Sequence, residues 1–209
     1  MDSPRVVGVF LFEKFELLDA CGPMQMLAGS SKTFQVKLLG PSMSPVASGV
    51  GQTAGPRLMP DDIWETSQRL DILLVPGGMG TRSEVGNQRL LEALRKHASS
   101  AELITSVCTG AAVLAKAGLL DGKRATSNKL AFKWVKEQGL KTTWVPQARW
   151  VVDGNVMTSG GIAAGIDMAL AIFAHYRGEE AAAKMASLME YEWHSDPSWD
   201  PFAKMAGLI

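Results

Sequence analysis

One cysteine in this chain stands where a nucleophile would stand. Leu103, Ile104 and Val107 belong to a β-prone run that ends at Cys108, and small apolar residues follow from Gly110 onward. This pattern predicts a strand, an abrupt turn and a buried helix. At such a corner the helix macrodipole and unpaired N–H groups favour a thiolate. A small cysteine that only packs in the core is the alternative interpretation.

The rest of the chain supplies strands and helices in alternation. Buried strands are predicted at residues 5–12, 33–39 and 71–76, and helices at 88–97, 129–138, 163–175 and 179–190. Asp153-Gly154 between two β-prone runs predicts a hairpin. Residues 13–28 are expected to form a loop and a short helix carrying Asp19, with Pro23 opening a further turn, and residues 61–65 a capped helical turn. Alternating elements of this kind predict an α/β sandwich around a mostly parallel sheet.

Ligands of such sheets bind beyond the carboxyl ends of the strands. Three stretches are expected at that edge: residues 13–22 after the first strand, Gly77-Gly78 after the third, and Cys108-Thr109 after the fourth. Their convergence is the site that the sequence predicts.

Length and composition indicate how the chain is organised and which binding partners are not expected. The 209 residues are expected to form one domain, 1–209, whose aromatic tail at 191–209 docks on the body or on a partner subunit. The formal net charge is zero, so there is no electrostatic reason to expect binding to nucleic acid or to an anionic membrane. The two cysteines, Cys21 and Cys108, show neither disulfide nor metal spacing. No signal peptide or long apolar run is evident, so a cytoplasmic location and no membrane contact are expected.

Several ordered motifs resemble the ThiJ/PfpI superfamily. They are Val75-Pro-Gly-Gly78, Ser106-Val-Cys-Thr-Gly-Ala111, residues 117–126, residues 159–170 and Leu17-Leu-Asp-Ala-Cys-Gly-Pro23. With the last of these added, the set resembles the isonitrile hydratase branch and the amidase-like domains of some transcription regulators. The resemblance implies a flavodoxin-like, class I glutamine amidotransferase-like sandwich, usually a homodimer, acting on a small molecule without metal or cofactor.

The resemblance also implies roles for four residues. Cys108 matches the nucleophile on its elbow, and Asp19 matches the carboxylate that meets it. Thr109 matches a residue important in isonitrile hydratases, and Gly78 matches a backbone N–H donor near the substrate. A carboxylate and a thiolate within hydrogen-bonding reach repel and are expected to share one proton, with the charge favoured on sulfur and Asp19 as the proton carrier.

These roles suit the hydration of an isonitrile, R–N≡C, to an N-substituted formamide, with a thioimidate on Cys108 as one possible intermediate. Without the resemblance, Asp19 would be interpreted as a helix-capping or surface residue. Asp167 is expected to cap or pack. Trp193 or His194 in the aromatic tail is an open candidate for the pocket.

One departure from the superfamily bears on mechanism. Many members have a histidine in the segment that matches residues 125–128, and this chain has Asn128 there. A Cys–His protease or amidase is therefore disfavoured. Two alternatives of another class stay open: a cysteine-based redox sensor or stress-response protein without turnover, and a regulatory ligand-binding domain, which the absence of a basic DNA-binding segment weakens.

Overall fold

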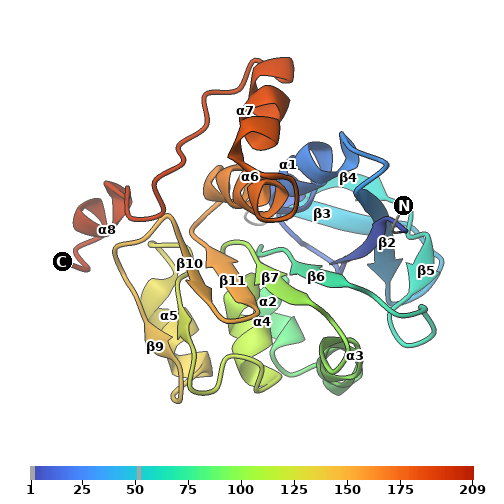
Figure 1. Cartoon of the computed structure of the whole chain (residues 1–209). Coiled ribbons are helices and arrows are strands. Elements are labelled where there is room, and N and C mark those ends of the chain that lie inside the picture. The colour runs from blue at the N-terminus through green and yellow to red at the C-terminus, as the bar shows by residue number, and fades with distance from the viewer. Residues whose placement is uncertain (1–2, 51–52) are drawn as a thin grey trace.

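A seven-stranded sheet runs through the centre of the protein (Figure 1). The computed structural model describes residues 3–50 and 53–209. The strand order is β10-β11-β7-β6-β1-β2-β5. The strands are β1 (Arg5–Phe10), β2 (Phe34–Gly40), β5 (Asp62–Ile63), β6 (Ile72–Val75), β7 (Leu103–Ser106), β10 (Trp150–Asp153) and β11 (Val156–Ser159).

Pairing in the sheet is parallel between all neighbours except β10 and β11. The order β2-β1-β6-β7-β11 is that of flavodoxin-like doubly wound sheets. The predicted α/β fold with a mostly parallel central sheet is confirmed. So is the hairpin at Asp153-Gly154, where Asp153 pairs with Val156 and Gly154 adopts a φ of +62°.

Two smaller sheets lie outside the central one. They are formed by β3 (Val46–Val50) with β4 (Thr53–Leu58), which pair antiparallel, and by β8 (Arg124–Ala125) with β9 (Thr143–Trp144), which pair parallel.

Helices cover both faces of the central sheet, as Figure 1 shows. One face carries α1 (Leu17–Ala28), α6 (Ala164–Arg177) and α7 (Glu179–Leu188). The other carries α2 (Thr81–Glu84), α3 (Gln88–Ala98), α4 (Gly110–Lys116) and α5 (Phe132–Gln138), and α8 (Phe202–Met205) lies near the C-terminus. This double cover explains why β6 is apolar and buried at all four positions.

Two local predictions are wrong. Residues 61–65 do not form a helical turn: Asp62 and Ile63 form β5, which pairs with Leu39 and Gly40 at the edge of the sheet. Residues 17–28 form the single helix α1, with Pro23 inside it, rather than a loop and two short pieces. In both places contacts with distant parts of the chain decide the structure.

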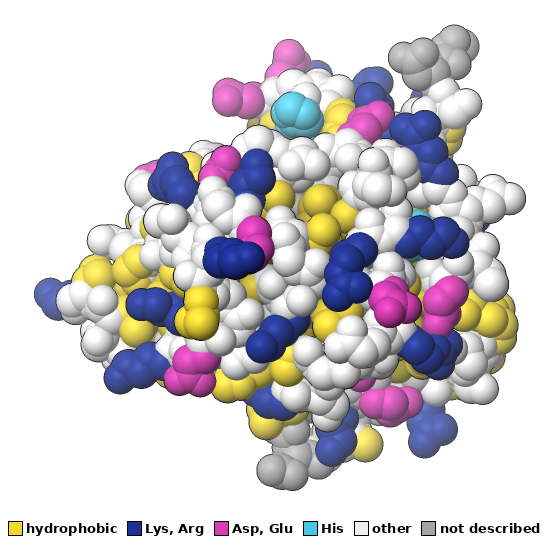
Figure 2. All heavy atoms as spheres, turned by 90° about the horizontal axis from the view of Figure 1, so that it is seen from below, with side chains coloured by type: hydrophobic (Ala, Val, Ile, Leu, Met, Phe, Trp, Pro, Cys, Tyr) yellow, Lys and Arg dark blue, Asp and Glu magenta, His cyan; other side chains and the backbone are white. Residues whose placement is uncertain are grey.

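The surface carries both signs of charge. Figure 2 views the side on which α3 and α5 lie, and basic and acidic side chains are interspersed there. None of the helices within the described residues is both long and apolar enough to cross a membrane.

Candidate active site

The backbone turns sharply at Cys108. Its φ is +57°, in the left-handed region that non-glycine residues rarely adopt. The Cys108 N–H donates to the carbonyls of Ser159 and Gly160 at 3.2 and 3.1 Å. The hydroxyl of Ser127, itself buried, donates to the Cys108 carbonyl at 2.7 Å. Three bonds from outside the turn therefore hold the strained residue between β7 and α4.

Close packing around the turn at Cys108 requires glycine at positions 77 and 110. A Cβ on Gly110 would lie 2.2 Å from the Val75 carbonyl oxygen. A Cβ on Gly77 would lie 2.6 Å from Thr109 N and 2.8 Å from both Asp19 Oδ2 and Cys108 Cβ. Gly77 thus marks the point at which the three predicted stretches meet, and the predicted convergence at the sheet edge is confirmed.

Asp19 lies in the first turn of α1 and is fully buried. Its Oδ2 accepts the Gly77 N–H at 2.9 Å. Its Oδ1 accepts no hydrogen bond of defined geometry from the described residues, although the Cys108 thiol is near enough to interact with the carboxylate. No cationic side chain among the described residues forms an ion pair with it. Asp19 is therefore neither a surface residue nor a helix cap.

Burial dominates the titration of the Asp19–Cys108 pair. It raises the pKa of Asp19 to about 7, against the opposing effect of the Gly77 N–H and with a further rise from the charge of Glu16. Burial and then the charge of Asp19 raise the pKa of the Cys108 thiol above its usual range, although the N–H and hydroxyl of Thr109 lower it.

This balance corrects one expectation. The sequence suggested that the helix end would favour charge on sulfur. In the structure, burial outweighs the donors of Thr109, so the resting sulfur is a thiol. The shared proton is still the consequence of placing the two groups together.

Thr109 and Gly78 form one unit beside the sulfur. Gly78 N–H donates to Thr109 Oγ1 at 3.0 Å, and the Thr109 hydroxyl lies 3.2 Å from Thr81 Oγ1. Gly78 has a φ of +116°, and a Cβ there would lie 2.4 Å from Glu16 N. The Gly78 N–H therefore acts on Thr109 in this structure, and a role in binding substrate directly stays a prediction.

A cavity of about 320 Å³ opens over the thiol. Ten residues line it: Glu16, Gly78, Met79, Arg82, Cys108, Thr109, Asn128, Leu130, Ala131 and Ile162. Asp19 is absent from this lining because its side chain is fully buried next to Cys108. None of the three histidines, all within the described residues, lines the cavity, which agrees with the disfavoured Cys–His mechanism.

Arg82 is the cation of this cavity and was missed from the sequence. Its Nη1 donates to Gly78 O at 3.2 Å and to Thr81 Oγ1 at 3.1 Å, and its guanidinium carbon lies 4.2 Å from the centre of the Trp134 ring. Arg82 could have been predicted from its position in the sequence, because it follows Gly78 by four residues and so lies at the same edge of the sheet. Glu16 was likewise overlooked, although it precedes Asp19 by three residues.

The aromatic tail docks around a second buried aspartate, Asp167. Arg149 Nε donates to Asp167 Oδ2 at 2.6 Å, and the Tyr191 hydroxyl and His194 N–H each donate to Oδ1 at 3.1 Å. Trp193 Nε1 donates to the Asp167 carbonyl at 3.2 Å. Trp193 and His194 thus hold the tail, and neither lines the cavity over Cys108.

Comparison with known proteins identifies the family that shares this sequence. The model of the DJ-1/PfpI family matches residues 5–175. The chain belongs to the DJ-1/PfpI family. It is 38% identical over 187 residues to an isonitrile hydratase from Pseudomonas putida, covering 88% of this chain and 78% of that protein.

Solved structures of this family have the same fold. A THiJ/PfpI family protein from Pseudomonas syringae superposes with a TM-score of 0.80 at 28% identity, covering 94% of this chain and 78% of that one. Drosophila melanogaster DJ-1beta gives a TM-score of 0.77 at 25% identity, covering 91% of this chain and all of that one. The family thus contains proteins with different names and roles, and the site must decide among them.

Within the described residues, no group of three His, Cys, Asp or Glu side chains is arranged to hold a metal ion.

Proposed function

We propose that this protein is an isonitrile hydratase, which converts R–N≡C and water to R–NH–CHO. The observation that carries the proposal is the buried Asp19 carboxyl, which is unpaired with any cation among the described residues and lies beside a strained cysteine. The similarity to the Pseudomonas putida isonitrile hydratase supports it. Small-molecule chemistry also suits a cavity of about 320 Å³ over the thiol.

The reaction begins with the one proton that the pair shares near neutral pH. This proton passes to the terminal carbon of the isonitrile while a sulfur electron pair forms the C–S bond. The product is a thioimidate, R–N=CH–S–Cys108, with Asp19 left as a carboxylate. The pKa of Asp19, about 7, suits a group that must give and take a proton near neutral pH.

The second half uses Asp19 as a base. A water oxygen adds to the thioimidate carbon, and its proton moves through Asp19 to the nitrogen. The adduct R–NH–CH(OH)–S–Cys108 then breaks its C–S bond. Its hydroxyl proton returns to the pair, which releases the formamide and restores the starting state. No atom or electron is left over.

Thr109 assists at the sulfur. Its N–H and hydroxyl lower the pKa of the Cys108 thiol, so they favour the negative sulfur that attacks and later leaves. Gly78 orients that hydroxyl through its N–H. Arg82, on the cavity wall, adds a positive charge near the same sulfur.

The redox-sensor alternative receives less support from the geometry. Rapid oxidation needs an exposed thiolate. Cys108 is only 7% exposed, and burial raises its pKa. The homodimer, which the resemblance implies, and the cytoplasmic location, which the sequence leads us to expect, stay predictions.

The test is formamide production from a panel of aliphatic and aromatic isonitriles. We expect turnover by the wild type and none by Cys108→Ala or Asp19→Asn. Cys21→Ala is the matched control, because Cys21 is a half-buried thiol that does not line the cavity, and it should keep full activity. Turnover that survives Cys108→Ala, or no turnover of any isonitrile by the wild type, would overturn the proposal.

A further inference from the structure

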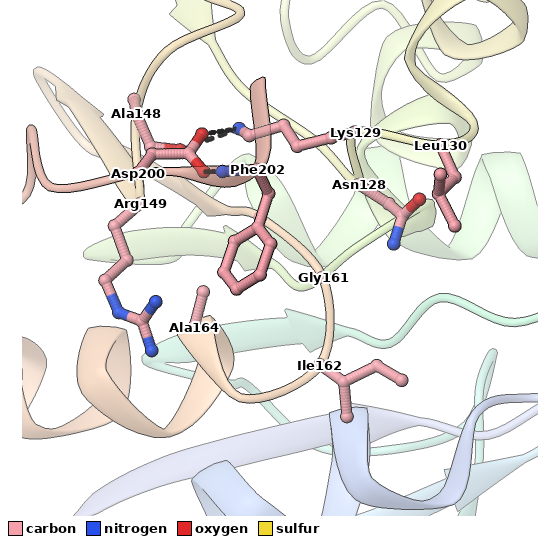
Figure 3. A pocket seen from close by; sticks show the side chains of 11 residues that line it. Asn128, Lys129, Leu130, Ala148, Arg149, Gly161, Ile162, Ala164, Asp200 and Phe202 are labelled. Atoms are coloured by element: carbon pink, nitrogen blue, oxygen red, sulfur yellow. Dashed lines mark hydrogen bonds and ion pairs between the residues drawn. The ribbon is translucent and has the colours of Figure 1, made fainter. Parts of the chain in front are cut away.

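A second cavity, of about 240 Å³, lies beside the one over Cys108 (Figure 3). Leu130, Ile162, Ala164 and Phe202 supply its apolar wall. In Figure 3 the Phe202 ring extends into the space between Arg149 and Gly161. Phe202 belongs to α8 in the aromatic tail, so the tail forms one wall of this cavity.

The two cavities adjoin and share part of their lining. Asn128, Leu130 and Ile162 line both of them. Gly160, in the wall of the second cavity, also accepts the Cys108 N–H at 3.1 Å. A ligand that reacts at the sulfur and extends past these three side chains would reach the second cavity.

The charged groups of the second cavity are already paired. Lys129 Nζ lies 3.1 Å from Asp200 Oδ2 and donates to the Ala148 carbonyl at 2.7 Å. Arg149 is paired with Asp167. The cavity thus offers apolar surface and no free charge. A cavity of about 150 Å³ is large enough for benzene, so this one has room for a six-membered ring.

We infer that the second cavity is the subsite for an apolar N-substituent of the substrate, such as a cycloalkyl or aryl ring. Phe202 and Ile162 set the size of group that it accepts. This inference rests on the proposed function, because it assigns the reacting carbon to Cys108 and the substituent to the tail side of the same site.

The ion pair between Lys129 and Asp200 positions Phe202. The side chains of the pair are 7% and 2% exposed. Asp200 Oδ1 also accepts the Phe202 N–H at 2.9 Å, which fixes the start of α8. The buried ion pair therefore holds the tail against the rest of the protein at Asp200, two residues before Phe202.

The test compares methyl isonitrile with cyclohexyl isonitrile. For Phe202→Ala we expect kcat/KM to fall about tenfold for the cyclohexyl substrate, mainly through KM, and to stay within about twofold for the methyl substrate. Met205→Ala is the matched control, because Met205 lies on the same helix, is 80% exposed and does not line the cavity. Equal effects of Phe202→Ala on both substrates, or no effect on either, would overturn the subsite.

A second measurement separates the subsite from the reaction. N-cyclohexylformamide should protect Cys108 of the wild type from iodoacetamide, N-methylformamide should protect it far less, and Phe202→Ala should lose the difference. This pattern in a protein that hydrates no isonitrile would refute the proposed function and leave the apolar subsite standing. Equal protection by the two formamides in the wild type would overturn the subsite itself.

Discussion

Asp19 and Asp167 are both fully buried, and they are surrounded in opposite ways. Asp167 is paired with Arg149 and accepts hydrogen bonds from Tyr191 and His194. Asp19 accepts the Gly77 N–H and has a thiol rather than a cation beside it. Burial of a charge is costly unless partners compensate it. The compensated carboxylate holds the tail in place, whereas the uncompensated one keeps a proton available for chemistry.

The largest difference that we expect between the two aspartates is in catalytic activity. Asp19→Asn keeps the acceptor for the Gly77 N–H but cannot carry the proton. We expect it to lower formamide production by at least about 10³-fold with circular dichroism unchanged. The folded fraction of Asp167→Asn should turn over at a rate close to wild type. Comparable losses in the two folded variants would break the distinction.

The second effect is on the free energy of unfolding. Here the larger loss is expected for Asp167 and not for Asp19. Asp167→Asn leaves the buried Arg149 without its counter-charge, and breaking a buried ion pair in this way costs about 3–5 kcal/mol. Urea denaturation should show a loss of that size, together with faster proteolysis after residue 191. A loss below about 1 kcal/mol would mean that Asp167 does not anchor the tail.

Asp19→Asn should instead stabilise the protein, and only at higher pH. The folded pKa of Asp19, about 7, is above its ordinary value of 3.8. Ionised Asp19 therefore opposes folding, with a cost that is absent below about pH 4, grows through the window from 3.8 to 7 and is complete above it. We expect a gain on the order of 2–4 kcal/mol at pH 8 and little at pH 4.5. An equal gain at both pH values would show that ionisation is not its cause.

Arg82 is a cation near the sulfur of Cys108 that forms no ion pair with Asp19. It therefore allows the effect of a nearby positive charge on the thiol to be tested separately. Burial lowers the pKa of Arg82, and a negative charge on Cys108 opposes that effect, so by reciprocity the Arg82 charge favours the thiolate of Cys108. Alkylation of Cys108 at pH 8 should slow about threefold to tenfold in Arg82→Met. Arg89→Met is the control, since Arg89 lies over Trp64 and away from this cavity. An unchanged rate in Arg82→Met would remove Arg82 from the site.

The elbow could be predicted from the sequence because its signal is local. A β-prone run, Cys108 and a run of small helical residues specify strand, turn and helix within fifteen positions. The motif resemblance added Asp19, Thr109 and Gly78. Their roles stay predictions, although the structure brings Asp19 and Thr109 to the sulfur.

The remaining features depend on distant contacts and left no local signal. Trp64, in the region predicted as a helical turn, packs in the hydrophobic core, where its indole N–H donates to the carbonyls of Leu11 and Leu39. The burial of Asp19, which reverses the balance of charge in the pair, depends on how α1 packs beside Gly77. The wall that Phe202 gives to the second cavity depends on where Phe202, 74 residues after Asn128, comes to lie.

The most direct test of the central claim is to titrate Asp19 itself. In protein labelled with ¹³C at the aspartate carboxyl carbon, the signal that disappears in Asp19→Asn identifies the residue in the NMR spectrum. A buried carboxyl without a cationic partner, sharing a proton with Cys108, should titrate near pH 7. Titration near pH 4 would show that Asp19 is an ordinary carboxylate at neutral pH, which would contradict its role as the proton carrier.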